Sequence, residues 1–173
     1  VQTFIEQAYI PDILAVSQAF PDYWEVGRWY SNFLAYGAYP EPEHSSEKLF
    51  PGGVVIDGIL SDFDDTAITE DVMYSLFSSQ SGLPPSKSQT VPDPHKENAY
   101  SWIKAPRYHQ HAMEVGPLAR LMIAYLTAKN ADIRNTIDSF LAQSGNTPER
   151  LISVMGRHAT RAIESKIIAD RCS

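Results

Sequence analysis

The sequence predicts a mainly α-helical fold with a small β element, an α+β protein built on an antiparallel helical bundle. Three observations support this prediction. Apolar residues recur at helical spacing near the start of the chain, they recur again through its last third, and a short segment between these regions has the pattern of a β-hairpin. The chain has 173 residues, of which 43% are hydrophobic and 20% charged. That is enough for one domain with its own core, so we expect residues 1–173 to form a single domain.

The first helix is predicted over residues 3–19. Its apolar side chains follow the helical period and are Phe4, Ile5, Ala8, Tyr9, Ile13, Leu14 and Val16. Because Pro11 has no backbone N–H, we expect this helix to kink or restart there. The segment 21–39 that follows is dense in aromatic residues and is expected to be irregular.

The β element is predicted at residues 54–60. Asp57 and Gly58 lie between two apolar runs, and this dipeptide suits a type I′ turn because both central residues need positive φ. Farther along, residues 78–98 are rich in Ser, Pro, Lys and Gln and predict a loop rather than a domain boundary.

A short helix is expected between the hairpin and this loop. Thr69 has the side chain of an N-cap residue, and Glu70 and Asp71 would then lie in the first turn. Carboxylates at that end of a helix interact favourably with its dipole.

Two helices are predicted next. Residues 114–128 are apolar on nearly every side, which is typical of a buried helix, and Pro117 suits its first turn. Residues 131–143 place their apolar side chains on one face, and Gly145 suits the end of that helix.

The last helix is expected to begin at Thr147 as the N-cap, with Pro148 in first position, and to run to about residue 170. Its apolar face would consist of Leu151, Met155, Ala159, Ala162, Ile163 and Ile167. Its opposite, solvent-facing side would carry Arg157, Arg161, Glu164, Lys166 and Asp170.

Charge and hydropathy narrow the classes of function. The net charge is −7, with 21 acidic and 14 basic side chains, so the chain is a poor binder of nucleic-acid backbone. No apolar run approaches the roughly 20 residues of a transmembrane helix. The start has no signal-peptide pattern, and it has no initiator Met, so we expect the chain to begin partway through a longer protein.

Metal-binding patterns are weak. Cys172 is the one cysteine, which excludes a cysteine cage made by this chain alone. His109, His111 and Glu114 form the most metal-like group, because two histidines spaced by one residue share a face in a strand. A site needs further ligands that the sequence does not supply, so a solvated turn is the preferred interpretation.

The acidic run at 62–65 lacks the glycine and the final glutamate of a calcium-binding loop. We interpret it as a turn with carboxylates that cap a helix. The sequence also contains no phosphate-binding loop, no dinucleotide fingerprint and no nucleophile elbow.

Lys104 and Arg107 lie on either side of Ala105 and Pro106 and are predicted to lie in an extended segment, because Ala105, the residue before the proline, avoids the helical region. If either cation is buried it needs an anionic partner, and Glu70 and Glu114 are candidates by charge alone. The alternative is a pair of surface cations whose stems lie along apolar surface. Spacing alone favours the surface alternative.

This part of the chain carries a family resemblance. The longest motifs read AYSWIKAPRY at 99–108 and MEVGPLAR at 113–120. They resemble the central signature of nickel–iron hydrogenase large subunits. Shorter matches follow in the family's order at 4–16, 32–37, 50–54, 68–72 and 156–164. The resemblance covers nearly the whole chain and implies that it is the central portion of a larger catalytic-subunit fold.

The resemblance implies reversible oxidation of H₂ to protons and electrons, with a nickel–iron centre and magnesium in the complete family member. In that family two CxxC pairs bind the centre, and this chain has neither, so we expect no cofactor on this chain alone. The turn at His109–His111 also departs from the Asp-Gly type usual in the family.

The resemblance further places Lys104 and Glu70 in the outer shell around the family's buried magnesium region. Arg107 and Glu114 are weaker candidates, expected to tie the loop to the bundle. The catalytic residues themselves remain unknown.

Three functions stay open. The first is the central portion of a hydrogenase large subunit that works with its remaining segments and an iron–sulfur small subunit, with H₂ as substrate. The second is a non-catalytic, stand-alone scaffold or assembly module that reuses the fold. The third is a cut gene product whose exposed apolar faces favour self-association. The family resemblance allows either a periplasmic, membrane-associated location or a cytoplasmic one.

Overall fold

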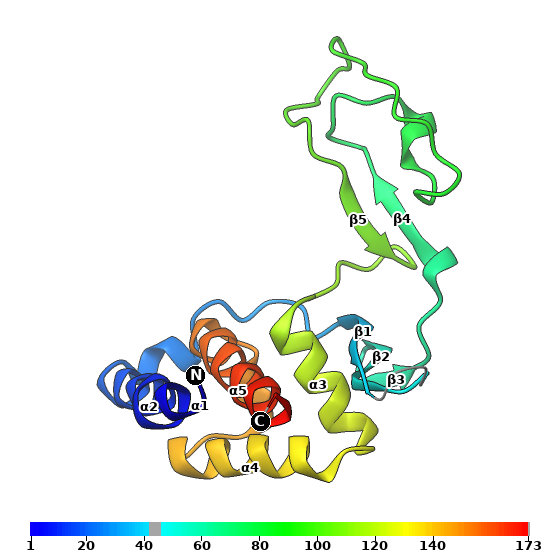
Figure 1. Cartoon of the computed structure of the whole chain (residues 1–173). Coiled ribbons are helices and arrows are strands. Elements are labelled where there is room, and N and C mark those ends of the chain that lie inside the picture. The colour runs from blue at the N-terminus through cyan, green and yellow to red at the C-terminus, as the bar shows by residue number, and fades with distance from the viewer. Residues whose placement is uncertain (42–45, 173) are drawn as a thin grey trace. The chain divides into compact units, whose positions relative to one another are not determined.

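The computed structural model describes residues 1–41 and 46–172. It forms two compact units (Figure 1). Unit 1 comprises the described residues of Val1–Phe63 and Glu114–Ser173, and unit 2 is Asp64–Met113. Helices dominate and two small antiparallel sheets accompany them, so the predicted α+β class is confirmed. The expectation of a single domain stays a prediction.

Unit 1 opens with one uninterrupted helical run. It consists of α1 (Gln2–Phe4), a π-helical segment (Ile5–Tyr9) and α2 (Ile10–Ala19). The π-helical segment ends two residues before Pro11. Since a proline cannot donate to the carbonyl one turn earlier, wider i→i+5 pairing is one way to continue the helix. The predicted irregularity is therefore a change of helical pitch.

Three further helices complete unit 1: α3 (Pro117–Thr127), α4 (Ala131–Ser144) and α5 (Val154–Arg171). Pro117 occupies the start of α3 and Gly145 ends α4 in the left-handed conformation, as predicted. None of the helices in the described part of the chain is long and apolar enough to cross a membrane.

The predicted start of the last helix is wrong. Pro148 opens a short 3-10 helix (Pro148–Leu151), and α5 begins only after Ser153, whose Oγ accepts a hydrogen bond from the Gly156 amide at 3.0 Å. A Cβ at Gly156 would lie only 2.0 Å from the Leu151 carbonyl oxygen. The backbone doubles back so tightly here that only glycine fits, and this close approach separates the two helical segments.

The sheet of unit 1 has strand order β1 (Phe33–Pro40), β2 (Lys48–Ile56), β3 (Ile59–Ser61), and all pairs are antiparallel. The predicted hairpin is confirmed, since Asp57 and Gly58 have φ of 50° and 80°. Strand β1 was not expected, because it lies in the aromatic-rich segment interpreted as irregular. Pairing with β2, not a local pattern, fixes it as a strand.

Helix α3 packs against both β1 and β2 and against α5, so it lies at the centre of the unit 1 core. This confirms the predicted burial of residues 114–128 for the helix itself. The largest fully buried apolar side chains of the core are Phe50, Val54, Leu118, Leu121, Ile123, Ile133, Ile137, Leu151 and Ile163.

Unit 2 is built around a two-stranded antiparallel sheet of β4 (Ile68–Asp71) and β5 (Ala105–Tyr108). Short 3-10 turns at Asp65–Ala67 and Ser79–Gly82 are its helical elements. Most of the remaining chain is turn and loop, as predicted for 78–98.

The expected helix after Thr69 is wrong. Thr69 and Glu70 lie in β4, opposite Arg107 and Pro106 of β5. The partner strand is far away in sequence, so local capping signals could not reveal the pairing. The capping carboxylate is instead Asp64, whose Oδ1 accepts hydrogen bonds from the amide and hydroxyl of Thr66 at 2.9 and 2.7 Å. That agrees with the interpretation of the acidic run as a capping turn, and these bonds lower the pKa of Asp64.

Candidate functional site

Lys104 and Glu70 form the most enclosed polar pair of unit 2. The Lys104 Nζ lies 2.8 Å from Glu70 Oε2 and donates to Thr90 Oγ1 at 2.9 Å. The side chains are only 13% and 25% exposed. Nζ also lies 5.6 Å from the centre of the Phe77 ring, within range of a cation–π contact. The surface alternative is therefore wrong for Lys104, and its anionic partner is one of the two that charge suggested.

The sheet explains why these two side chains meet. Register places Asp71 opposite Ala105 and Glu70 opposite Pro106, so Lys104 reaches the sheet beside Glu70 just before β5 begins. The loop 78–98 completes the cluster, because Thr90 accepts from Lys104 and the Ser88 hydroxyl lies 3.5 Å from Glu70 Oε2. A buried ammonium that is paired and hydrogen-bonded in this way is held in one position.

Arg107 does not join this cluster. Its Nη1 donates to the carbonyl of Pro106 at 2.9 Å, and the residue is half-buried on β5. The structure therefore brings Lys104 and Glu70 together and leaves Arg107 with a local backbone contact.

Glu114 belongs to unit 1 and pairs with Arg157 of α5. Arg157 Nε and Nη2 donate to the two carboxylate oxygens, each at 2.8 Å, and Nη1 donates to the Gly27 carbonyl at 2.8 Å. The backbone of Glu114 also exchanges hydrogen bonds with the start of β1, at Asn32 and Leu34. Glu114 thus joins β1 to α5, and its hydrogen bonds raise the pKa of Arg157.

A second such pair was missed by the sequence analysis. Arg120 of α3 donates to both oxygens of Glu164 on α5, at 2.6 and 2.9 Å, which raises the pKa of Arg120. Glu164 was expected on the solvent face of its helix, together with Arg157, and both placements are wrong because each side chain is largely enclosed. The available signal was Arg120 itself, since an arginine within a buried helix needs a carboxylate.

The two histidines do not form a strand. His109 and Gln110 have φ of 45° and 68°, and Tyr108 and His111 exchange backbone hydrogen bonds across them. This is a tight turn with both histidines exposed, which agrees with the preferred interpretation of a solvated turn. Among the described residues, 1–41 and 46–172, no three His, Cys, Asp or Glu side chains gather in a group able to hold a metal ion.

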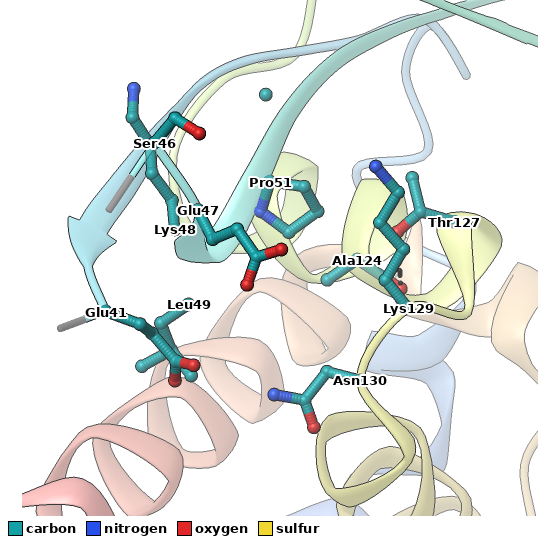
Figure 2. Close-up of a pocket in the computed structure, with 11 residues that line it drawn as sticks. Glu41, Ser46, Glu47, Lys48, Leu49, Pro51, Ala124, Thr127, Lys129 and Asn130 are labelled. Carbon is teal, nitrogen blue, oxygen red and sulfur yellow. Dashed lines mark hydrogen bonds between the residues drawn. The ribbon is translucent and has the colours of Figure 1, made fainter.

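Unit 1 also has a polar pocket of 640 Å³ (Figure 2). None of the four candidate residues lines it. Three of its polar side chains make structural hydrogen bonds: Lys48 donates to the Tyr36 carbonyl, Thr127 donates to the Ala124 carbonyl, and Asn130 caps α4. We assign no chemistry to this pocket.

Comparison with known proteins identifies the family of this chain. The model of the nickel-dependent hydrogenase family matches residues 1–173. This chain belongs to the nickel-dependent hydrogenase family. A curated relative, the periplasmic [NiFeSe] hydrogenase large subunit of Desulfomicrobium baculatum, is 34% identical over 98% of this chain. The uptake hydrogenase large subunit of Rhizobium leguminosarum bv. viciae is 36% identical over 94% of this chain.

Solved hydrogenases have the same fold. The H₂-activated [NiFeSe] hydrogenase of Dm. baculatum superimposes with a TM-score of 0.84 and 32% identity over 98% of this chain. The [NiFeSe] hydrogenase of D. vulgaris Hildenborough gives 0.81 and 31% over 97%. The chain spans about a third of the length of these relatives, 34% and 32% of the two curated large subunits and 36% of each solved chain. It therefore corresponds to part of a hydrogenase large subunit.

Membership in the nickel-dependent hydrogenases implies a nickel–iron centre in the complete protein. The donors of this chain do not fit such a centre, which calls for several soft thiolate ligands. Cys172 is the one cysteine of the chain, and it is exposed. The chain therefore does not supply the thiolate set that a nickel–iron centre needs.

Proposed function

We propose that this chain is a scaffold portion of a hydrogenase large subunit that catalyses the reversible oxidation of H₂ to protons and electrons. In this proposal, residues outside the chain hold the nickel–iron centre, and an iron–sulfur small subunit exchanges the electrons. The observation that carries it is the full-length family match, combined with a fold that superimposes on solved hydrogenases over nearly every residue.

Lys104 and Glu70 are proposed as positioning residues outside the metal shell. Their pair is enclosed and hydrogen-bonded. Lys104 lies in the longest motif that resembles the family, at 99–108, and Glu70 lies in the shorter match at 68–72. Glu70 has the oxygen donors that magnesium prefers, but its Oε2 already faces an ammonium at 2.8 Å. A second cation at that oxygen would be repelled, so the pair suits a place beside a magnesium region rather than a ligand role.

The test is H₂ oxidation by the complete hydrogenase, assayed with an artificial electron acceptor alongside nickel content. Lys104→Met and Glu70→Gln should each lower activity about 10- to 100-fold, the usual cost of losing a residue that orients a metal site. Lys104→Arg should restore part of the activity. Lys87→Met is the matched control, because Lys87 lies in the same unit and is exposed.

The outcomes separate the parts of the proposal. Full activity in Lys104→Met would remove the positioning role and leave the family function intact. A metal-loaded wild-type complex that neither oxidises nor evolves H₂ would contradict the catalytic function and favour the non-catalytic scaffold.

A further inference from the structure

Unit 2 is held together mainly by hydrogen bonds. The structure describes every residue of Asp64–Met113, and Val72 and Tyr108 are its only buried apolar side chains. With so little apolar burial, hydrophobic packing offsets only a small part of the entropy lost when a long loop becomes ordered. The conformation of loop 78–98 therefore depends on polar side chains that bond one part of the unit to another.

Ser81 is the one fully buried residue of loop 78–98. Its Oγ donates to the Gln89 carbonyl at 2.9 Å and accepts from the Val91 amide at 3.0 Å. A hydroxyl can do both at once, because it has one proton and two lone pairs. One buried hydroxyl thus binds the peptide groups on both sides of Thr90.

Thr90 carries this constraint to the Lys104 ammonium. Its Oγ1 accepts from Lys104 Nζ at 2.9 Å, on the ammonium that also pairs with Glu70. Thr90 itself is exposed, so its position comes from its backbone and not from burial of its side chain. A hydrogen bond to an exposed hydroxyl stabilises an ammonium only when little entropy is lost in ordering the acceptor. Ser81 supplies that order in advance.

The turn that carries Ser81 also lies against the strand that carries Glu70. A Cβ at Gly82, the next residue of this turn, would lie only 3.1 Å from the Glu70 carbonyl oxygen. The turn and β4 are therefore in direct contact. The contacts form a closed circuit that runs from the ion pair through Thr90 to Ser81 and back to β4.

A neutral acceptor suits positioning rather than charge compensation. The pair of Lys104 and Glu70 already has no net charge, and a second carboxylate would leave an enclosed site with an excess negative charge. A hydroxyl adds a directional hydrogen bond without that charge. Because a lysine ammonium is a compact charge on a flexible stem, a second acceptor restricts the position of Nζ more than one partner can.

We infer that Ser81 and Thr90 are positioning residues that fix the ammonium of Lys104. Ser81 orders the backbone on both sides of Thr90, and the Thr90 hydroxyl then keeps Lys104 Nζ beside Glu70. This inference deepens the proposed function and rests on it, because that function gives the position of Lys104 its consequence for H₂ oxidation. Each contact that carries the inference lies within unit 2.

The first test is H₂ oxidation by the complete hydrogenase, normalised to nickel content. Thr90→Val keeps the shape of the side chain but removes the acceptor, and it should lower kcat about 3- to 10-fold, as expected for one neutral hydrogen bond. Thr90→Ser keeps the hydroxyl and should retain most of the wild-type rate. Ser81→Ala should cause a loss like that of Thr90→Val. Ser79→Ala is its matched control and should cause none, since Ser79 lies in the same turn and is exposed.

Double variants show whether both residues act through Lys104. In a Lys104→Met background, Thr90→Val and Ser81→Ala should cause no further loss of activity, because the ammonium that they position is gone. Losses that simply multiply would overturn the inference, since a general weakening of unit 2 acts in either background.

The chemical reactivity of Lys104 gives a readout that does not depend on turnover. Reductive methylation of the complete hydrogenase with formaldehyde and a borohydride, followed by peptide mass spectrometry, measures the rate at each lysine amine. Methylation of Lys104 should become at least about threefold faster in Thr90→Val and Ser81→Ala, because the amine is less firmly bonded. The exposed Lys129 of unit 1 is the internal reference and should keep its rate. Unchanged reactivity of Lys104 in both variants would overturn the inference.

The two proposals fail in different ways. A wild-type complex that oxidises H₂, with full activity in Thr90→Val, removes only the positioning residues. A metal-loaded wild-type complex that does not turn over H₂ removes the proposed function. Faster methylation of Lys104 in the two variants would then still support the placement of its ammonium by Ser81 and Thr90.

Discussion

The two units of this chain reach stability by different routes. In unit 1, helix α3 lies against a sheet and a neighbouring helix, and the core side chains around Leu121 and Ile163 are fully buried. In unit 2 the ammonium groups of Lys96 and Lys104 connect separate segments by hydrogen bonds. The stability gained from a buried apolar side chain does not depend on particular hydrogen-bond partners. A buried ammonium, in contrast, destabilises the fold when it loses any of its acceptors. The comparison therefore predicts different responses to substitution.

The largest effect is expected in the core of unit 1. Leu121→Ala should lower the free energy of unfolding by about 3–5 kcal/mol, because the side chain is fully buried and the site leaves a cavity. Leu83→Ala in unit 2 is the control and should change it by less than about 0.5 kcal/mol, since Leu83 is half exposed. Equal losses of unfolding free energy in the two variants, measured by denaturant unfolding, would contradict the difference between the two units.

Next in size is the Arg120–Glu164 pair between α3 and α5. Glu164→Gln should cost about 2 kcal/mol by chemical denaturation, less than for a fully buried pair because Arg120 keeps 28% exposure. Replacing both partners, with Arg120→Met and Glu164→Leu, should recover much of the loss, since neither charge is then left alone. A double variant less stable than Glu164→Gln would contradict this expectation. It would show that the ion pair stabilises the protein more than two apolar side chains at the same positions do.

Unit 2 should respond to the loss of a single ammonium. Lys96→Met removes the ammonium that donates to the Phe77 and Val72 carbonyls, of which Val72 keeps the Ser75 amide as a donor, and should lower the local opening free energy by about 1–2 kcal/mol. Faster amide exchange should then appear in Asp64–Met113 and not in α3. Exchange that rises equally in both units would mean that they open together.

The smallest expected effect concerns pH. The hydrogen bond from Lys166 to Glu6, at 2.7 Å, and the Asp170 carboxylate raise the pKa of Lys166. The stabilisation is therefore complete below the unfolded pKa of about 10.4 and disappears as pH rises through the higher folded value. The loss should be below about 1 kcal/mol, because both side chains are partly exposed. Stability measured across this range should depend less on pH in Lys166→Met than in the wild type.

Much of unit 1 could be predicted from local patterns. Apolar periodicity fixed the burial of α3, Gly145 fixed the end of α4, and Asp57 with Gly58 fixed the hairpin turn. Each of these signals acts within a few residues, so the physical cause is present in the sequence itself. The family motif at 99–108 can likewise be identified from the sequence alone.

What the sequence could not decide depends on distant contacts. Thr69 has a cap side chain, yet its segment becomes a strand because β5 pairs with it across the loop 78–98. Thr147 also looks like a cap, but the backbone contact between Gly156 and Leu151 moves the helix start to Ser153. Local propensity is worth about 1 kcal/mol at such positions, and pairing or packing readily exceeds it.

The candidate site divides in the same way. The sequence by itself determined that Lys104 lies in an extended, proline-restricted segment and that the chain has too few thiolates for a nickel–iron centre. Only the tertiary structure decided that Lys104 is enclosed and paired with Glu70, and that Glu114 pairs with Arg157. Charge alone offered two candidate partners, Glu70 and Glu114, for Lys104 and Arg107. Because an ion pair depends on distance and on exclusion of water, the fold had to select among them.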